Sequence, residues 1–354
     1  MNSNHEASGA GIACFHYIMG VIELNDRAVS LFENYDLTIS KTRKGRGAMI
    51  AETDKGMKIL TEYQGHKEKA ELLEHVMRYI KEQGFPYIDC LLRNNDGEII
   101  TTDYDGRQYV VKDFLPGREC NVKDLQECRR VVKELAKLHS CMCGLFDDYK
   151  SPVSRQNMMG EFDKKNAQLK RVRAFIRKSP VKTDFELLFL KEYDRFLKQT
   201  QTAGSCLTDE VCDALCRRVT ENAVYCHGDC SHHNLLIADD HVSIINFEKC
   251  KTDTQLKDLA LFLRKVLEKN AWSASFGMGI LHAYGEIRPL SAEEFSYLFA
   301  RLSYPEKFVK IAGSYLNQRK SLPAKRQSDK LCALLEMEEA RTAFLNEYRK
   351  ECLR

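Results

Sequence analysis

The segment from His227 to Asn234 brings together side chains that are suited to acid–base and metal chemistry. An enzyme that transfers a phosphoryl group needs a carboxylate to accept the proton of the attacking hydroxyl, and an amide oxygen that helps to hold a magnesium ion. Asp229 and Asn234 have the required types and lie five residues apart. We therefore group Asp229 and His227 as catalytic candidates and assign Asn234 as a metal ligand. The competing interpretation is a polar loop between strands, because His, Asp and Asn are also common in turns.

A second metal ligand is expected where the strand after this loop ends. The sequence there is Ile245-Asn246-Phe247-Glu248, with an amide where an Asp is usual. A carboxylate about 4 Å from Mg²⁺ has a gross attraction of roughly 8 kcal/mol at an effective dielectric constant of about 20, and a neutral amide loses most of it. On a continuing strand, Glu248 would lie on the same side as Asn246 and could supply the missing carboxylate. Both residues therefore stay metal candidates.

The first third of the chain offers groups that could bind a nucleotide. Lys58 lies on a predicted strand and could contact the phosphates, with Glu74 or Glu71 of the following helix as its partner. A lone strand lysine is more often simply solvated. Gly45 and Gly47 could form a glycine-rich turn over the phosphates, although two glycines in a turn are ordinary.

Four further polar positions have a structural interpretation beside a functional one. Asp258 begins an apolar helix after the predicted hairpin, and it could accept backbone hydrogen bonds from the catalytic loop. Standing alone, it would be a solvent-facing acid in a first turn. His139 is interpreted as a helix packing residue, and His232 and His233 are interpreted as loop residues.

Hydrophobic periodicity predicts the elements that must position these residues. Strands are predicted over residues 36–42, 48–52, 57–63, 90–94, 98–103 and 108–114, with a helix over 67–83. After residue 115 helical periodicity dominates, over 125–142, 161–178, 185–200, 254–269, 291–303, 305–318 and 329–351. One hairpin interrupts the helices, with arms over 223–226, 235–237 and 242–245.

This plan predicts an α+β, bilobal fold of the protein-kinase type. A small antiparallel β lobe with one helix would be followed by a larger, mainly helical lobe that carries a catalytic β-hairpin. We predict a disordered N-terminal tail over residues 1–24, a small nucleotide-binding-like lobe over 25–115, and the helical lobe over 116–354. The catalytic hairpin would span residues 223–250.

Composition narrows the classes of function. The net charge of +3 over 354 residues gives no long-range attraction to nucleic acid, and no apolar stretch is long enough to span a membrane. The 14 cysteines are scattered without the paired spacing of a zinc site, which favours reduced thiols.

Residues 164–182 carry eight cationic side chains and no acidic one. Apolar residues recur there at helical spacing, so the segment is predicted to be an amphipathic helix with its cations outward. It would be either a solvated basic face or a docking surface for an acidic partner or an anionic substrate.

The chain resembles kinase-like enzymes of the aminoglycoside phosphotransferase and choline kinase type, and more closely the CotS family of spore coat proteins. The resemblance runs from about Asn25 to Phe344. It rests on the segments KGRGA (44–48), KDFLPGREC (112–120), HGD (227–229), INFEKC (245–250) and YPEKF (304–308).

The resemblance implies a protein made in the cytoplasm of the mother cell and then deposited in the spore coat, with other coat proteins as partners. It implies that Asp229 is the base and Lys58 the phosphate clamp, while Asp113 and Phe114 present backbone groups to adenine. ATP and Mg²⁺ are the implied cofactors, with binding weakened or lost through Asn246.

Three functions compete on this evidence. The favoured one is a spore coat protein involved in coat assembly, a pseudokinase with weak or absent phosphotransferase activity. The alternative is an active ATP-dependent phosphotransferase acting on a small hydroxylated or sugar-like molecule, since the proton acceptor and the first metal ligand are present. A nucleic-acid binder is disfavoured, because the basic segment lacks suitably placed aromatic residues for stacking.

Overall fold

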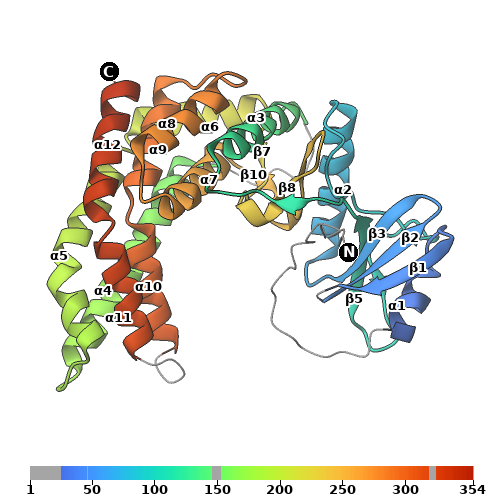
Figure 1. The fold of residues 1–354 in the computed structure, drawn as a ribbon, viewed down its shortest axis with the longest axis horizontal. Coiled ribbons are helices and arrows are strands. Elements are labelled where there is room, and N and C mark those ends of the chain that lie inside the picture. The colour runs from blue at the N-terminus through green and yellow to red at the C-terminus, as the bar shows by residue number, and fades with distance from the viewer. Residues whose placement is uncertain (1–24, 46, 146–152, 319–323, 354) are drawn as a thin grey trace, which may run out of the picture. The chain divides into compact units, whose positions relative to one another are not determined.

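The computed structural model describes residues 25–45, 47–145, 153–318 and 324–353, and the chain divides into two compact units (Figure 1). The small unit comprises the described residues up to Met77 together with Ile88–Arg118. The large unit comprises Arg78–Tyr87 and the described residues from Glu119 onward. The sequence placed the division after residue 115 and left 78–87 in the small lobe. The predicted tail over 1–24 lies outside the described residues.

Residues 78–87 belong to the large unit because of the contacts that they make there. The Tyr79 hydroxyl donates to the carbonyl of Cys143 at 2.8 Å. The backbone N–H of Ile244 donates to the carbonyl of Tyr87 at 2.9 Å, and the Tyr87 ring stacks on His241. The sequence predicts where the helix ends, at a glycine. Hydrophobic periodicity does not show which unit the last turn of the helix contacts.

The small unit is a five-stranded antiparallel sheet with strand order β1-β2-β3-β5-β4. The predicted meander is confirmed, whereas the strand expected over 90–94 is only an isolated bridge between Leu91 and Lys112. A short helix at the start was not predicted. The elements are α1 (Asn25–Phe32), β1 (Ile39–Lys44), β2 (Ala48–Thr53), β3 (Gly56–Glu62), α2 (Lys67–Glu82), β4 (Thr101–Thr102) and β5 (Gln108–Asp113).

The two faces of this sheet pack against different helices. On one face, Leu60 of β3 and Val111 of β5 form a cluster with Phe32 of α1. On the other face, Val110 packs in a cluster with Ala70 of α2. Because side chains alternate along a strand, each strand residue is thereby assigned to the α1 face or to the α2 face.

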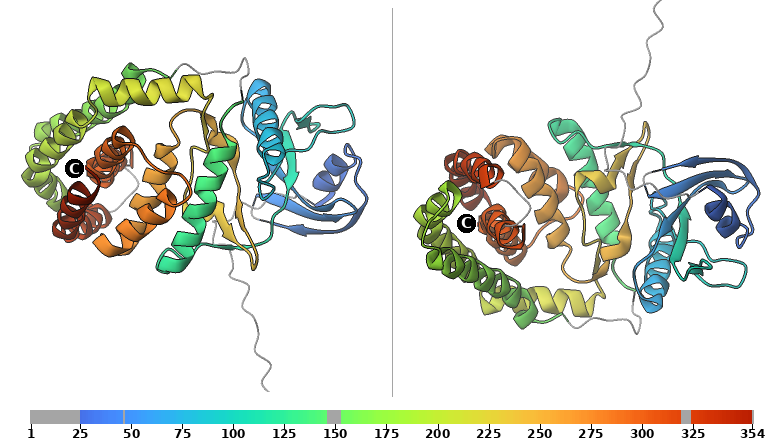
Figure 2. Two further views of the ribbon diagram at one scale, coloured as in Figure 1. Left: turned by 90° about the horizontal axis from the view of Figure 1, so that it is seen from above. Right: turned by 90° about the horizontal axis from the view of Figure 1, so that it is seen from below.

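The large unit is mainly helical, as predicted, and the α+β fold class is confirmed. In both views of Figure 2 the helices α4 and α5 curve round the C-terminal helices α10 to α12, drawn in red. The helices are α3 (Leu125–Cys141), α4 (Arg155–Lys178), α5 (Asp184–Ser205), α6 (Asp209–Glu221), α7 (Leu256–Lys269), α8 (Ala274–Gly285), α9 (Ala292–Ser303), α10 (Glu306–Gln318), α11 (Ala324–Leu335) and α12 (Glu338–Cys352).

Some helices differ from the predictions. Helices α6 and α8 were missed, and the helix expected over 329–351 is interrupted between α11 and α12. Helix α8 is apolar on most sides, so its sequence lacks the alternation of polar and apolar faces by which an amphipathic helix is recognised. The basic amphipathic helix is confirmed as α4, with Leu169, Val172 and Ile176 buried, but it ends before Lys182.

Short strands carry the predicted hairpin of the large unit. Strands β8 (Leu235–Ile237) and β9 (Val242–Ile244) pair antiparallel and join β6 (Arg118–Glu119) in one sheet. Strand β7 (Tyr225–Cys226) pairs instead with β10 (Lys251–Thr252), which was not predicted. The segment from His227 to Asn234 therefore connects two different sheets. Among the described residues, no helix is long and apolar enough to cross a membrane.

Packing between α7, α8 and α12 depends on Gly277 of α8. A Cβ atom there would lie 2.6 Å from the Phe344 ring and 2.8 Å from Leu267. We expect Gly277→Ala to lower the free energy of unfolding by about 1–2 kcal/mol through overpacking. Gly160→Ala in α4, where a Cβ has nothing within 4 Å, should raise it by about 0.5–1 kcal/mol through helix propensity. Chemical denaturation measures both, and a stabilised Gly277→Ala would contradict this packing.

Candidate functional site

A buried carboxylate holds the candidate catalytic loop in place. Asp258, in the first turn of α7, is 1% exposed. Its two oxygens accept the backbone N–H groups of His227 and Gly228, at 2.7 and 2.8 Å. These are the backbone contacts expected of Asp258 from the sequence. Hydrogen bonds from two successive amides fix both the position and the direction of the chain as it leaves β7.

His139 of α3 completes the support of this carboxylate. Its ring is fully buried and lies between Asp258, at 3.3 Å from Nε2, and the Tyr284 hydroxyl, at 2.7 Å from Nδ1. Burial lowers the pKa of His139, although Asp258 opposes the shift. The ring is thus neutral, with Nε2–H donating to the carboxylate. Burial raises the pKa of Asp258, but the hydrogen bonds from His139 and Gly228 outweigh it, and the net pKa is lowered.

Gly228 brings this loop against the segment that follows β9. Its φ is +83°, a left-handed conformation, and a Cβ atom would collide with the carbonyl oxygen of Lys249. Only glycine combines this conformation with so close an approach. The loop and the 3₁₀ helix η2 (Phe247–Lys249) are therefore packed backbone to backbone.

The His227 side chain also holds this loop. The ring is fully buried, with Nε2 donating to the Ile245 carbonyl at 3.0 Å and Nδ1 accepting the Asp229 N–H at 3.1 Å. It also meets the ring of Phe247 edge-on. Both nitrogens bond to backbone groups, which corrects the grouping of His227 with the catalytic candidates. The side chain positions Asp229 instead.

Asp229, the candidate proton acceptor, is partly exposed, and 34% of its side chain is accessible. One of its carboxylate oxygens lies 2.8 Å from Nζ of Lys249 in η2. A cation at this distance competes with an approaching hydroxyl for the same oxygen. Lys249 stands beside the expected metal ligands, but no spacing in the sequence predicts its pairing with Asp229.

The two amides expected to hold metal bond to each other. Asn234, in the 3₁₀ helix η1 (His232–Asn234), donates from Nδ2 to the Asp229 carbonyl at 2.8 Å. Its Oδ1 accepts from Nδ2 of Asn246 at 2.9 Å. The first bond fixes which end of the Asn234 amide faces Asn246, and Asn246 must therefore present its N–H. The Asn234 oxygen, the expected metal ligand, therefore already accepts one hydrogen bond.

Glu248 does not follow the strand geometry assumed for it. Strand β9 ends at Ile244, and Asn246 has φ +68° and ψ +64°. This left-handed residue turns the chain into η2, so the alternation of a strand no longer applies and that prediction was wrong. Asn is among the few non-glycine residues that adopt this conformation readily. Glu248 itself is exposed.

In the small unit, Lys58 was predicted to pair with a helix glutamate, and it does not. It faces the same side of β3 as Leu60, the α1 side, whereas α2 covers the other side. Its Nζ lies 2.7 Å from Asp113 across the β3–β5 pair. Glu74 and Glu71 of α2 pair instead with Arg93. On β3, the residues that face α2 are Met57, Ile59 and Thr61, and none of them is charged.

The connector after β5 uses its backbone within the small unit. The N–H of Asp113 donates to the Cys90 carbonyl and that of Phe114 to the Met57 carbonyl, both at 2.9 Å. These two N–H groups are thus not available to adenine, and a contact through the carbonyls of Asp113 and Phe114 stays a prediction. Gly45 and Gly47 lie in the turn between β1 and β2, as predicted, and a phosphate role for this turn stays a prediction.

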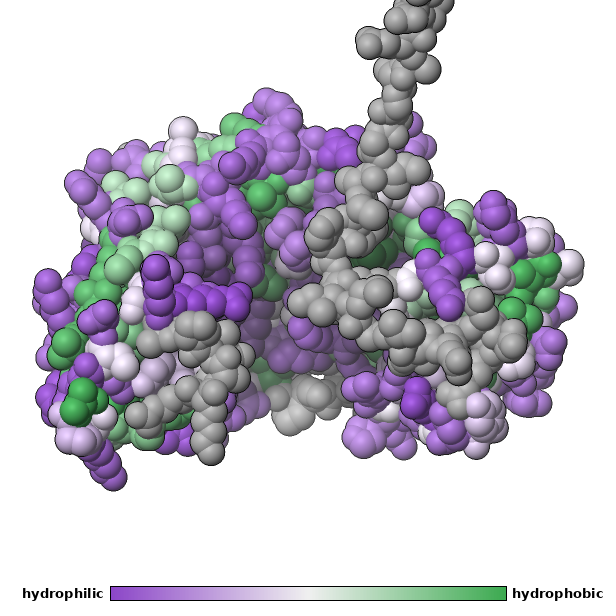
Figure 3. Space-filling view, turned by 60° about the horizontal axis from the view of Figure 1, so that its bottom comes forward, coloured by the Kyte–Doolittle hydropathy of each residue, from purple (hydrophilic) through white to green (hydrophobic). Residues whose placement is uncertain are grey.

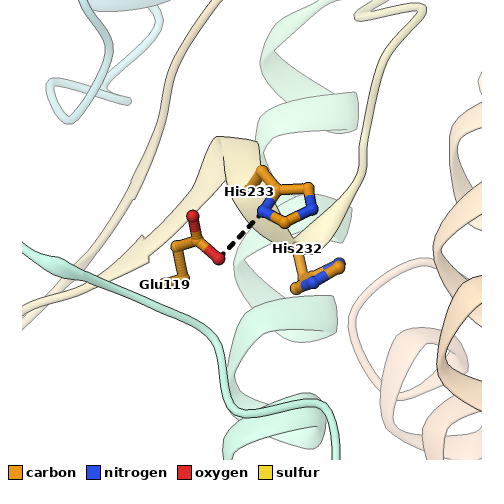
Figure 4. Close-up of side chains that lie close together, drawn as sticks. All are labelled: Glu119, His232 and His233. Atoms are coloured by element: carbon orange, nitrogen blue, oxygen red, sulfur yellow. Dashed lines mark hydrogen bonds and ion pairs between the residues drawn. The ribbon is translucent and has the colours of Figure 1, made fainter. Parts of the chain in front are cut away.

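Three side chains beside the loop present ligand atoms of the kind that zinc prefers (Figure 4). Glu119 of β6 and His232 and His233 of η1 place one ligand atom each within 4.8 Å of one another. Glu119 lies 2.9 Å from Nδ1 of His233, and Nδ1 of His232 is buried without a hydrogen-bond partner in the structure. No local spacing in the sequence predicts this group, because 112 residues separate Glu119 from the nearer histidine.

Comparison with known proteins adds to this geometry. The family model described as "Spore coat putative kinase YutH" matches residues 28–348. The chain belongs to this YutH family. A relative, spore coat protein S of Bacillus subtilis (strain 168), is 23% identical over 313 residues, which cover 88% of this chain and 89% of the relative. The expected resemblance to kinase-like spore coat proteins is confirmed.

Solved structures place this YutH family chain in the kinase-like fold. An aminoglycoside phosphotransferase from Alicyclobacillus acidocaldarius is similar with a TM-score of 0.81 at 19% identity, covering 95% of this chain and 98% of that one. A choline kinase from Cryptosporidium parvum gives a TM-score of 0.54 at 12% identity, covering 93% and 100%. At these identities the likeness concerns the fold alone.

The buried His139 predicts a dependence of stability on pH. The unfolded chain takes up a proton at this histidine near pH 6.5, whereas the folded chain resists it because its pKa is lowered. The free energy of unfolding should therefore fall as the pH drops below about 6.5, by up to about 1.4 kcal/mol per pH unit from this group. Denaturation of His139→Gln between pH 7.5 and 5 should show a shallower slope.

The matched control for that experiment is His282→Gln in α8. This histidine has 63% of its side chain exposed, so its ring remains in solvent when the chain folds. An equal change of slope in both variants would mean that the burial of His139 is not what resists the proton.

Proposed function

We propose that this chain is a component of the spore coat, built on a kinase-like scaffold that transfers phosphoryl groups weakly or not at all. It would be made in the cytoplasm of the mother cell during sporulation and would assemble with other coat proteins. The matched family and the Bacillus relative support the coat assignment, because both carry the words spore coat in their names.

The amide pair of Asn234 and Asn246 carries the proposal of weak catalysis. Magnesium takes oxygen ligands and favours carboxylates. Here the Asn234 oxygen already accepts an N–H from Asn246. As arranged, the pair does not fit a bound Mg²⁺, because the N–H group turns a partial positive charge toward the position of the ion. The Asn234 oxygen is thus engaged by the N–H of Asn246 instead of by a metal ion.

Two further features support the same proposal. Lys249 is paired with Asp229, so the candidate base is held by a cation. In the small unit, Lys58 lies on the α1 face of the sheet, and β3 presents no charged residue to α2. A kinase of this type needs a lysine that a helix glutamate orients toward the phosphates. ATP and Mg²⁺ would thus bind weakly.

The alternative is an active ATP-dependent phosphotransferase that uses a small hydroxylated or sugar-like acceptor. The partly exposed carboxylate of Asp229 favours it, since that group could accept a hydroxyl proton once Lys249 moved aside. Glu248 is exposed and would be the source of a carboxylate for the metal.

Replacing Asn246 by Asp, the residue usual at this position in kinases, distinguishes the weak or inactive protein from the active enzyme. Asn246→Asp removes the N–H that points at Asn234 and adds a negative charge, so Mg²⁺-dependent ATP binding should become about tenfold tighter. The measurement is calorimetric titration of ATP into the full chain, with and without Mg²⁺. Asn95→Asp, an exposed loop position, adds the same charge elsewhere and should change nothing.

The active enzyme would be favoured if the original chain binds Mg-ATP tightly and Asn246→Asp weakens that binding. Glu248→Gln should then abolish the effect of the metal, because that carboxylate would be the working ligand.

Coat assembly should not require the candidate base. Asp229→Asn keeps the size of the side chain but removes its charge, and the variant protein should reach the spore coat in the same amount as the original. Quantification of the protein extracted from purified spore coats measures this, after a thermal melt shows that the variant folds. A folded variant that fails to assemble would favour a catalytic role.

A further inference from the structure

A cationic pocket lies in the large unit beside the candidate catalytic loop. Its volume is about 310 Å³, within the range of small-molecule sites. Its wall includes Cys226 of β7 and Gly228 of the loop, together with residues of α4, α7, α9, α10 and β10. Figure 3 shows a face of the large unit on which hydrophilic residues surround a hollow.

The charges of the pocket wall are unbalanced. Among the described residues it has two acids, Glu161 and Glu306, and six cations. The cations are Lys165, Lys251, Lys257, Arg264, Arg301 and Lys310. Two further carboxylates outside the wall, Asp253 and Glu268, contact some of them. Six cationic side chains therefore share four carboxylates.

The two outer cations, Lys251 and Lys310, each share a carboxylate with another lysine, Asp253 and Glu306 respectively. Glu161 is shared by Lys165, Lys257 and Arg301 at 2.9–3.4 Å. By contrast, Lys310 lies 3.7 Å from Glu306, a carboxylate that Lys165 contacts at 2.8 Å. More than half of the Lys251 and Lys310 side chains is exposed. These two ammonium groups can turn toward a ligand without breaking the network around Glu161.

The electrostatic effect on neighbouring groups agrees with this excess of positive charge. Burial lowers the pKa of Lys310, and the nearby Arg264 lowers it further. Burial raises the pKa of Glu306, but Lys165 and Lys310 outweigh it and the net pKa is lowered. Around Glu306 and Lys310 the pocket therefore stabilises negative charge and disfavours additional positive charge.

We propose that this pocket binds a small anionic molecule of the sugar-phosphate class. Phosphate oxygens match clustered ammonium and guanidinium groups, and the pocket has room for a polyol beyond the phosphate. The proposal concerns binding and does not depend on phosphoryl transfer. A cationic amine, by contrast, would meet like charges in the wall.

Calorimetric titration of the full chain with four probes tests the proposal. Glucose 6-phosphate should bind, whereas glucose, which lacks the charge, and choline, which reverses it, should not. Inorganic phosphate is the fourth probe. If it binds as tightly as glucose 6-phosphate, the pocket is an anion site that recognises the phosphate group alone. Preferential binding of choline, or binding of none of the anions, would overturn the proposal.

Paired variants locate the binding in this pocket. Lys251→Gln with Lys310→Gln removes two exposed cations from the wall, and glucose 6-phosphate should bind about tenfold more weakly, with a smaller dependence on salt. Lys191→Gln with Lys198→Gln on the exposed face of α5 changes the net charge equally and should bind as the original chain does. Equal loss in both pairs, or loss in neither, would overturn the assignment of this pocket. Lys310→Glu is a second pocket variant and should weaken binding more than Lys310→Gln.

Discussion

The Asp258 carboxylate is the contact on which the arrangement of the loop depends. It is buried, it accepts two successive backbone N–H groups, and His139 holds it from the other side. An ionised group in the interior persists only when hydrogen bonds replace its lost water. The loop backbone supplies those bonds, so the acid and the loop stabilise each other. Every polar group of the loop is positioned relative to this anchor.

The same scaffold supports two different chemistries depending on a few side-chain atoms. The kinase-like fold is present, but Asn246 donates an N–H to the Asn234 oxygen, and Lys249 is paired with Asp229. Asp229 and the amides of Asn234 and Asn246 thus have partners within the protein. A protein that serves by assembly gains from this, because its folded state does not depend on a ligand.

The sequence allowed the fold and the loop to be predicted because both depend on local patterns. Strand alternation located β2, β3 and β5, and the spacing of Asp229 and Asn234 located the loop. The face of Lys58 could not be predicted, because it depends on which helix covers which side of the sheet. Likewise, the cationic pocket could not be predicted. Its side chains come from four helices and two strands that are spread over a long part of the sequence.

The close approach of Gly228 to Lys249 has a consequence for local dynamics. The amide hydrogens of His227 and Gly228 are shielded by a carboxylate that solvent hardly reaches. Lifting them from Asp258 displaces Gly228, whose backbone lies against that of η2. Both segments would therefore open in one cooperative event, and their slow hydrogen exchange would share a single free energy. By this argument the loop and η2 would move as one rigid body rather than as a hinge with a mobile flap.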